Sequence, residues 1–104
     1  MKSGHLYLKE GVDIDGLHPG MIRALPTICN VFYSFESPAV CTSGTDGEHM
    51  EGSLHYQHKA LDWRIWYIEE ERLPHLVDIM QRELGPDYDV VQESTHIHVE
   101  YDKR

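Results

Sequence analysis

The sequence predicts an α+β fold, in which two main helices pack on one face of a central, mostly antiparallel sheet. Apolar residues recur at helical spacing in two segments and alternate at strand spacing in others. Helices and strands do not follow one another in regular alternation, which disfavours a parallel α/β sheet. No repeat, linker or low-complexity stretch divides the 104 residues. We therefore expect a single domain over residues 1–104.

The first half of the chain predicts a strand, a helix and a second strand. Residues 6–8 form a short apolar run that ends in a Gly/Asp turn at 11–16. Pro19 suits the first turn of a helix, and Pro26 predicts a kink in it. The apolar face expected for this helix consists of Ile22, Leu25, Ile28, Phe32 and Phe35. Residues 39–42 then predict a buried strand.

The second half predicts a loop, a strand, a helix and a closing pair of strands. Residues 43–52 are polar and glycine-rich, whereas residues 60–67 alternate and are rich in Trp, Ile and Tyr. Trp63, Trp66 and Tyr67 are expected to pack in or around the core. The next segment has a helical apolar face, and Gly85-Pro86 ends it; that face is Leu73, Leu76, Val77, Met80 and Leu84. Residues 88–92 and 96–101 predict an antiparallel pair.

The charge balance excludes several classes of protein. Nine basic residues against 18 acidic ones give a formal net charge of -9. A chain this acidic lacks the positive surface that binds phosphate backbones or anionic membranes, so we expect neither nucleic acid nor membrane insertion. No run of 18 apolar residues and no signal peptide is recognised. Cys29 and Cys41 are therefore expected to be reduced core thiols.

Two short segments combine histidine with carboxylate in a pattern typical of metal sites. The first holds His55 and Asp62, and the second is the run His96-Ile-His98 near the C-terminus. Imidazole nitrogen and carboxylate oxygen suit zinc, and a catalytic zinc usually takes three protein ligands and leaves one position open. His96 and His98 are two apart in a predicted strand, so both point to one face of the sheet. One of them could bind a metal while the other stands beside it.

The pattern Ser-x-His-x-x-x-x-Ala-x-Asp, followed by the late His-x-His, resembles the zinc D-Ala-D-Ala carboxypeptidase family of peptidoglycan peptidases. The hedgehog N-terminal signalling domain is structurally related to this family. The runs at 46–49, 53–56 and 93–98 are similar to hedgehog, whereas the first strand, the first helix and the run at 42–44 resemble small phage-type peptidases. The resemblance covers essentially the whole chain.

Carried over to this sequence, the resemblance implies three Zn²⁺ ligands, His55, Asp62 and His98. His96 matches the histidine that stabilises the oxyanion, and Glu93 is the nearest match to the general base. Such a set suffices for amide hydrolysis, since zinc polarises the carbonyl and acidifies a bound water while the carboxylate transfers the proton.

The sequence also departs from the family pattern at several positions. Glu93 matches the base only with a one-residue deletion in the turn, and Gln92 takes its place in an ungapped register. His58 stands where the family usually has glycine. Its larger side chain could contact the metal ligands from outside, lie at the surface, or obstruct the metal site. The family's substrate-clamping arginine is missing, so His49 and Ser53 are the substrate contacts we expect.

These observations give two alternative functions. The first is a zinc-dependent peptidase of peptidoglycan, cutting an amide next to a D-amino acid in the stem peptide, as a D-Ala-D-Ala carboxypeptidase or an L-Ala-D-Glu endopeptidase. The resemblance implies a phage or prophage protein that stays in the cytoplasm until lysis or travels on the virion. The second is a zinc-binding, non-catalytic module that binds a protein partner, as hedgehog does.

Overall fold

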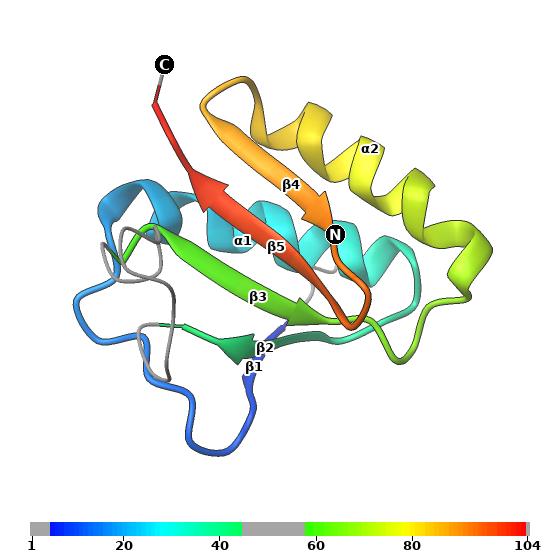
Figure 1. Cartoon of the computed structure of the whole chain (residues 1–104), viewed down its shortest axis with the longest axis horizontal. Coiled ribbons are helices and arrows are strands. Elements are labelled where there is room, and N and C mark those ends of the chain that lie inside the picture. The colour runs from blue at the N-terminus through cyan, green and yellow to red at the C-terminus, as the bar shows by residue number, and fades with distance from the viewer. Residues whose placement is uncertain (1–4, 45–57, 104) are drawn as a thin grey trace.

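The computed structural model describes residues 5–44 and 58–103, and all structural statements below concern these residues. Figure 1 shows how the helices and strands are arranged and the chain path between them. In chain order the elements are β1 (Leu6–Leu8), α1 (Pro19–Ser34), β2 (Ala39–Ser43), β3 (Ala60–Arg64), the 3₁₀ helix η1 (Glu70–Arg72), α2 (Leu73–Leu84), β4 (Tyr88–Gln92) and β5 (His96–Tyr101).

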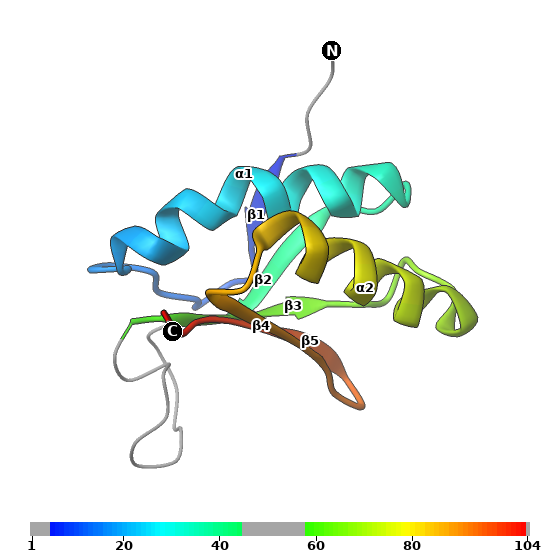
Figure 2. The same ribbon diagram turned by 90° about the horizontal axis from the view of Figure 1, so that it is seen from above.

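The five strands form one sheet in the order β1-β2-β3-β5-β4. β1 pairs with β2 in parallel, and the other three pairings are antiparallel. Both helices lie on the same side of this sheet, as the view from above shows (Figure 2). The predicted α+β class, with a mostly antiparallel sheet and two helices on one face, is therefore confirmed. The opposite face of the sheet carries no described helix.

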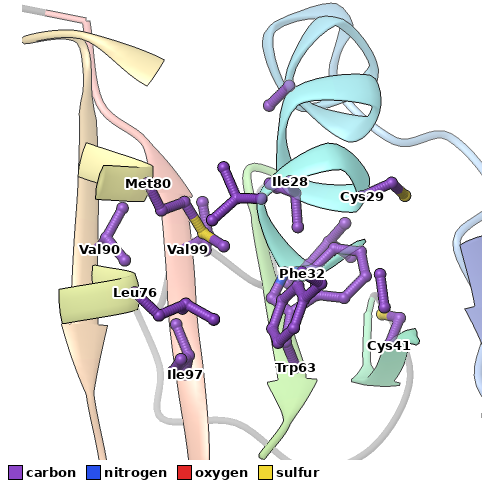
Figure 3. Packing of buried hydrophobic residues seen from close by; sticks show 14 of the residues in the cluster. Ile28, Cys29, Phe32, Cys41, Trp63, Leu76, Met80, Val90, Ile97 and Val99 are labelled. Atoms are coloured by element: carbon purple, nitrogen blue, oxygen red, sulfur yellow. The ribbon is translucent and has the colours of Figure 1, made fainter. Parts of the chain in front are cut away.

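The hydrophobic core fills the space between the helices and the sheet (Figure 3). Trp63 of β3 lies against Phe32 of α1, with ring centroids 6.1 Å apart, and Leu76 and Met80 of α2 cover β4 and β5. Cys29 and Cys41 are both buried free thiols, as predicted. Burial raises the pKa of the Cys29 thiol, which keeps it protonated and unreactive.

Helix α1 buries part of the predicted face: Ile28, Phe32 and Phe35 are buried, but Ile22 is not. Met21 is fully buried, whereas Ile22 is 52% exposed. The buried side runs through Met21, Ala24, Ile28, Val31 and Phe32, so the correct stripe starts one residue earlier. The helix continues through Pro26, which is exposed. Because Pro26 lacks an N–H, the carbonyl of Ile22 has no helical donor, and on this exposed side water can take that place.

His18 begins α1 as its N-cap. Its Nδ1 accepts a hydrogen bond of 3.0 Å from the backbone N–H of Gly20, and its ring stacks on Tyr101 at 5.2 Å. A side chain at Gly20 would clash with the same tyrosine, since a Cβ there would lie 2.5 Å from the ring. The start of α1 is thus fixed to the end of β5, and His18 is half-buried.

Strand β3 ends at Arg64, three residues earlier than the alternation predicts. Arg64 is the last residue of β3 that pairs with β5, opposite His96 where β5 begins. Beyond this point the neighbouring strand offers no backbone groups, so the chain turns toward η1. Trp66 and Tyr67 are consequently 71% and 53% exposed, and the prediction that they pack around the core is wrong.

Candidate metal centre

The side chains of the predicted site lie on the face of the sheet away from the helices. In β3 and β5 the residues Leu61, Trp63, Ile97 and Val99 point into the core and are essentially inaccessible. Because side chains alternate along a strand, Asp62 and its neighbours in this register point the other way. The two strands therefore place one polar row on the outer face, consisting of Asp62, Arg64, His96, His98 and Glu100.

Asp62 and His98 face one another directly across the β3–β5 pair. The Oδ1 of Asp62 lies 2.9 Å from the Nδ1 of His98, and the two side chains are only 13% and 19% exposed. Two ligand atoms bound to one tetrahedral zinc ion are about 3.3 Å apart, given bonds of about 2.0–2.1 Å. This pair therefore fits two of the three predicted zinc ligands with little movement.

His96 approaches the same carboxylate from the next position of the outer face. Its Nε2 lies 3.6 Å from the Oδ1 of Asp62, and its Nδ1 lies 3.0 Å from the hydroxyl of Thr95. The structure thus brings together three of the predicted site residues: Asp62, His96 and His98. His55, the third predicted ligand, and the predicted substrate contacts His49 and Ser53 lie outside the described residues.

The environment of His98 favours its protonated form. Its hydrogen bond to Asp62 raises the pKa of the imidazole most, partial burial opposes that rise, and a second hydrogen bond to Glu100 adds to it. The Nε2 of His98 lies 2.9 Å from Oε1 of Glu100. Both ring nitrogens therefore face carboxylates, an arrangement that attracts either a proton or a metal cation.

The pairing of β4 with β5 shows where Gln92 and Glu93, the two candidates for the position of the general base, lie. Gln92 pairs with Ile97, a fully buried core residue, and so lies on the helix-covered side of the sheet. Glu93 follows the end of β4, and its N–H donates to the carbonyl of His96 at 2.8 Å. Glu93 lies beyond the end of the strand and, with Gln92, lines a pocket beside Ile68 and Leu73. Its exposed carboxylate makes no hydrogen bond with another described residue.

His58 has a backbone role. Its φ is +62°, in the left-handed region that glycine adopts most readily. Its carbonyl accepts from the N–H of His18 at 2.9 Å, and its Nδ1 lies 3.2 Å from the carbonyl of Asp15. These contacts tie the start of β3 to the turn before α1. This role as a tie between two segments differs from the three interpretations of His58 that the sequence left open.

The outer face also carries acidic groups that the sequence analysis did not single out. Ligand oxygens of Asp89, Glu100 and Asp102 all lie within 4.8 Å of one another. Asp89 pairs with Glu100 across the β4–β5 pair. The spacing His98, Glu100, Asp102 follows the strand period of two, which is the signal that could have found this row. Acidic groups at a sheet surface are common without a metal, so this cluster is no site by itself.

A pocket of about 420 Å³ adjoins Arg64 at the edge of the outer face. Its lining includes Tyr7, Lys9, Val40 and Tyr67. The guanidinium carbon of Arg64 lies 3.7 Å from the ring centroid of Trp66, a cation–π contact. Its Nε is buried and has no hydrogen-bond partner. A somewhat larger pocket of about 480 Å³ lies at the far edge of the sheet, beyond β1, where it is lined by aromatic and polar residues remote from Asp62.

Comparison with known proteins gives no independent support for a family. A scan against protein-family models finds no match, and a search of curated proteins also finds none. Within residues 5–44 and 58–103, no helix is long and apolar enough to cross a membrane. What points to a function is therefore the resemblance in sequence and the geometry of the outer face.

Proposed function

We propose that this protein is a zinc-dependent peptidase that hydrolyses an amide bond next to a D-amino acid in peptidoglycan. The observation that carries the proposal is the contact of 2.9 Å between Asp62 and His98, with His96 beside the same carboxylate on the outer face of the sheet. Asp62 and His98, together with His55, would hold the metal. When bound, zinc would polarise the scissile carbonyl and lower the pKa of a water molecule.

The protein's own residues would supply the remaining chemistry. His96, next to the ligands on the outer face, would donate a hydrogen bond to the oxygen of the scissile carbonyl as negative charge develops there. Glu93, at the adjacent hairpin end, would accept a proton from the attacking water and return it to the leaving amine. Its exposed carboxylate would move toward the substrate, since catalytic contacts often tighten only when substrate binds.

The pocket beside Arg64 would receive the substrate peptide. Arg64 and Asp62 are two residues apart on the same face of β3, which corresponds to about 7 Å along a strand. That distance matches about two residues of extended peptide. Arg64 forms no ion pair with a described carboxylate, although acidic residues outnumber basic ones by 18 to nine. A stem-peptide carboxylate would therefore find there a guanidinium that stacks on Trp66 and has no ion-pair partner among the described residues.

The setting of this activity follows from the same resemblance. A phage or prophage protein that attacks the cell wall would act after its release from the cytoplasm by lysis, or from a virion. The sheet face and its polar row are compatible with both routes and do not favour one of them.

The test combines metal analysis with an assay on murein. Purified protein reconstituted with zinc should bind one ion per chain and release D-Ala or new amino groups from murein. Asp62→Asn and His98→Ala should lose both the metal and the release. His75→Ala is the matched control, because His75 is an exposed histidine on α2 whose ring contacts Phe35 on the helix side. Full activity in Asp62→Asn or His98→Ala would contradict the proposal.

A second function, a non-catalytic zinc module that binds a protein, is favoured by one observation. The Glu93 carboxylate has no hydrogen bond that would orient it toward Asp62 or His98. Zinc bound at one ion per chain, without turnover on murein or on its isolated stem peptides, would favour this alternative. Hydrolysis that disappears in Glu93→Gln, with zinc retained, would favour the peptidase.

A further inference from the structure

We propose that Glu100 is a positioning residue for the metal centre, which holds the His98 ring so that Nδ1 faces the metal and Asp62. The inference rests on the proposed zinc site and adds a residue to it. Glu100 would not touch the metal or the substrate. It would act through the imidazole of His98, by binding the nitrogen on the far side of the ring.

Both nitrogens of the His98 ring lie at hydrogen-bond distance from carboxylates. Nε2 lies 2.9 Å from Oε1 of Glu100, and Nδ1 lies 2.9 Å from Oδ1 of Asp62. An ionised carboxylate only accepts hydrogen bonds, so Nε2 must carry a proton to satisfy Glu100. A metal at Nδ1 then replaces one proton, and the proton at Nε2 stays. This leaves the lone pair of the neutral imidazole at Nδ1, toward Asp62.

The backbone of Glu100 is held rigidly in the sheet. Glu100 lies in β5, between β3 and β4, and its backbone pairs with Ala60 on one side and Asp89 on the other. Its side chain is 21% exposed, about as protected as that of His98. Glu100 and His98 are two residues apart on one face, so the sheet itself fixes the distance between the carboxylate and the ring. A loop residue in the same contact would be less well placed.

The surroundings of Glu100 are negatively charged. Asp102 and Asp89 bring their carboxylate oxygens within 4.8 Å of Glu100. Three nearby carboxylates make this end of the outer face strongly negative, which favours a hydrogen-bond donor and disfavours a lone pair at Nε2. Carboxylates that bind the far nitrogen of a ligand histidine are common in metal sites, where they fix the tautomer and increase the basicity of the ligand. The contact between Glu100 and His98 has this form.

The test measures metal binding directly, without an activity assay. Zinc affinity is determined by competition with a chromophoric chelator for the wild type and for Glu100→Gln, which keeps the shape and loses the charge. We expect Glu100→Gln to bind zinc about 10–100-fold more weakly, the usual effect of removing such a partner. Asp102→Asn is the matched control: it removes one charge from the same cluster, and Asp102 makes no hydrogen bond with His98. Its affinity should stay within about threefold of wild type.

A second measurement does not depend on a variant. Nitrogen-15 NMR of the histidines in the zinc-loaded wild type should show His98 protonated at Nε2 and metal-bound at Nδ1. The opposite tautomer would overturn the inference, as would equal zinc affinity in Glu100→Gln and the wild type, or equal losses in Glu100→Gln and Asp102→Asn. Failure of the wild type to bind zinc would overturn both this inference and the proposed function. Weaker zinc binding in Glu100→Gln, with no hydrolysis by the wild type, would support the inference and contradict only the peptidase.

Discussion

The two faces of the same strands differ in what holds their side chains in place. On the helix side, Leu61, Trp63, Ile97 and Val99 are at most 1% exposed, and packing against the helices fixes them. On the outer side, Asp62 and His98 are partly exposed and are fixed by hydrogen bonds to one another. A histidine between two carboxylates is a weak source of stability compared with an apolar core. This difference indicates that the inner face maintains the fold and the outer face is available for function.

The largest expected effect comes from breaking the inner face. Trp63→Ala removes a fully buried side chain that contacts Phe32, and should lower the free energy of unfolding by about 3–5 kcal/mol. The free energy of unfolding of a whole domain is typically about 5–15 kcal/mol, so this loss is a large part of it. Urea unfolding followed by circular dichroism measures the loss.

The control for this variant is Trp66→Ala, because Trp66 is an exposed tryptophan near the same strand. It removes the contacts with Arg64 and Tyr67 at the surface, so about 1 kcal/mol or less should be lost. Similar losses in the two variants would mean that Trp63 does not form the core contact described above.

The next largest effect tests the outer face. Zinc at a free concentration of 100 times its dissociation constant should stabilise the wild type by about 2.7 kcal/mol, if it binds only the folded chain. Asp62→Asn should lose this gain because the ligand carboxylate is gone, yet its metal-free stability should remain close to wild type. Thermal unfolding with zinc and with a chelator measures both quantities. A gain from zinc that persists in Asp62→Asn would place the metal elsewhere.

The elements that the sequence predicted well are those whose boundaries are set locally. The helix Leu73–Leu84 ends where Gly85-Pro86 cannot continue it, and the strands Tyr88–Gln92 and His96–Tyr101 follow an uninterrupted alternation. For Asp62 and His98, residue type and strand spacing indicated only that a carboxylate and one of two histidines could meet at a metal, and the family resemblance selected His98. Their contact across the β3–β5 pair agrees with that expectation.

The features that escaped prediction depend on which segments become neighbours. The end of β3 at Arg64 is decided by the residue of β5 that lies opposite, which no local pattern specifies. The contact of Glu100 with His98, on which its proposed role rests, could not be predicted for the same reason. A glutamate in a strand looks like an ordinary surface residue until its neighbours are known. Ile22 was assigned to the wrong side of α1 because Met21 and Ala24 define an equally good helical stripe.

A smaller effect concerns substrate recognition next to the ligands. If Arg64 binds a peptide carboxylate, Arg64→Gln should raise KM for diacetyl-L-Lys-D-Ala-D-Ala about tenfold, the effect of losing one charged hydrogen bond, with kcat little changed. The C-terminal amide of the same peptide should be insensitive to this variant. Arg82→Gln is the control, since Arg82 pairs with Asp78 on the exposed side of α2. Equal KM changes for the acid and the amide would exclude a carboxylate contact.

The smallest effect is the pH dependence of the metal-free protein. Because Asp62 and Glu100 raise the pKa of His98 above its ordinary value of 6.5, the folded state binds this proton more tightly than the unfolded chain does. The stabilisation is complete below about pH 6.5 and is lost as the pH rises through the folded-state pKa. Urea unfolding in chelator should therefore show wild type losing stability relative to His98→Gln across this window, whereas His75→Gln should follow wild type.

Zinc affinity should change in the opposite direction over the same pH window. Because a metal at Nδ1 must displace a proton, affinity in the wild type should increase as the pH rises through the pKa of His98. Opposite slopes for metal-free stability and for zinc affinity are expected only if one nitrogen serves both the proton and the metal. A zinc affinity independent of pH in this window would show that the metal does not compete for the proton held between Asp62 and His98.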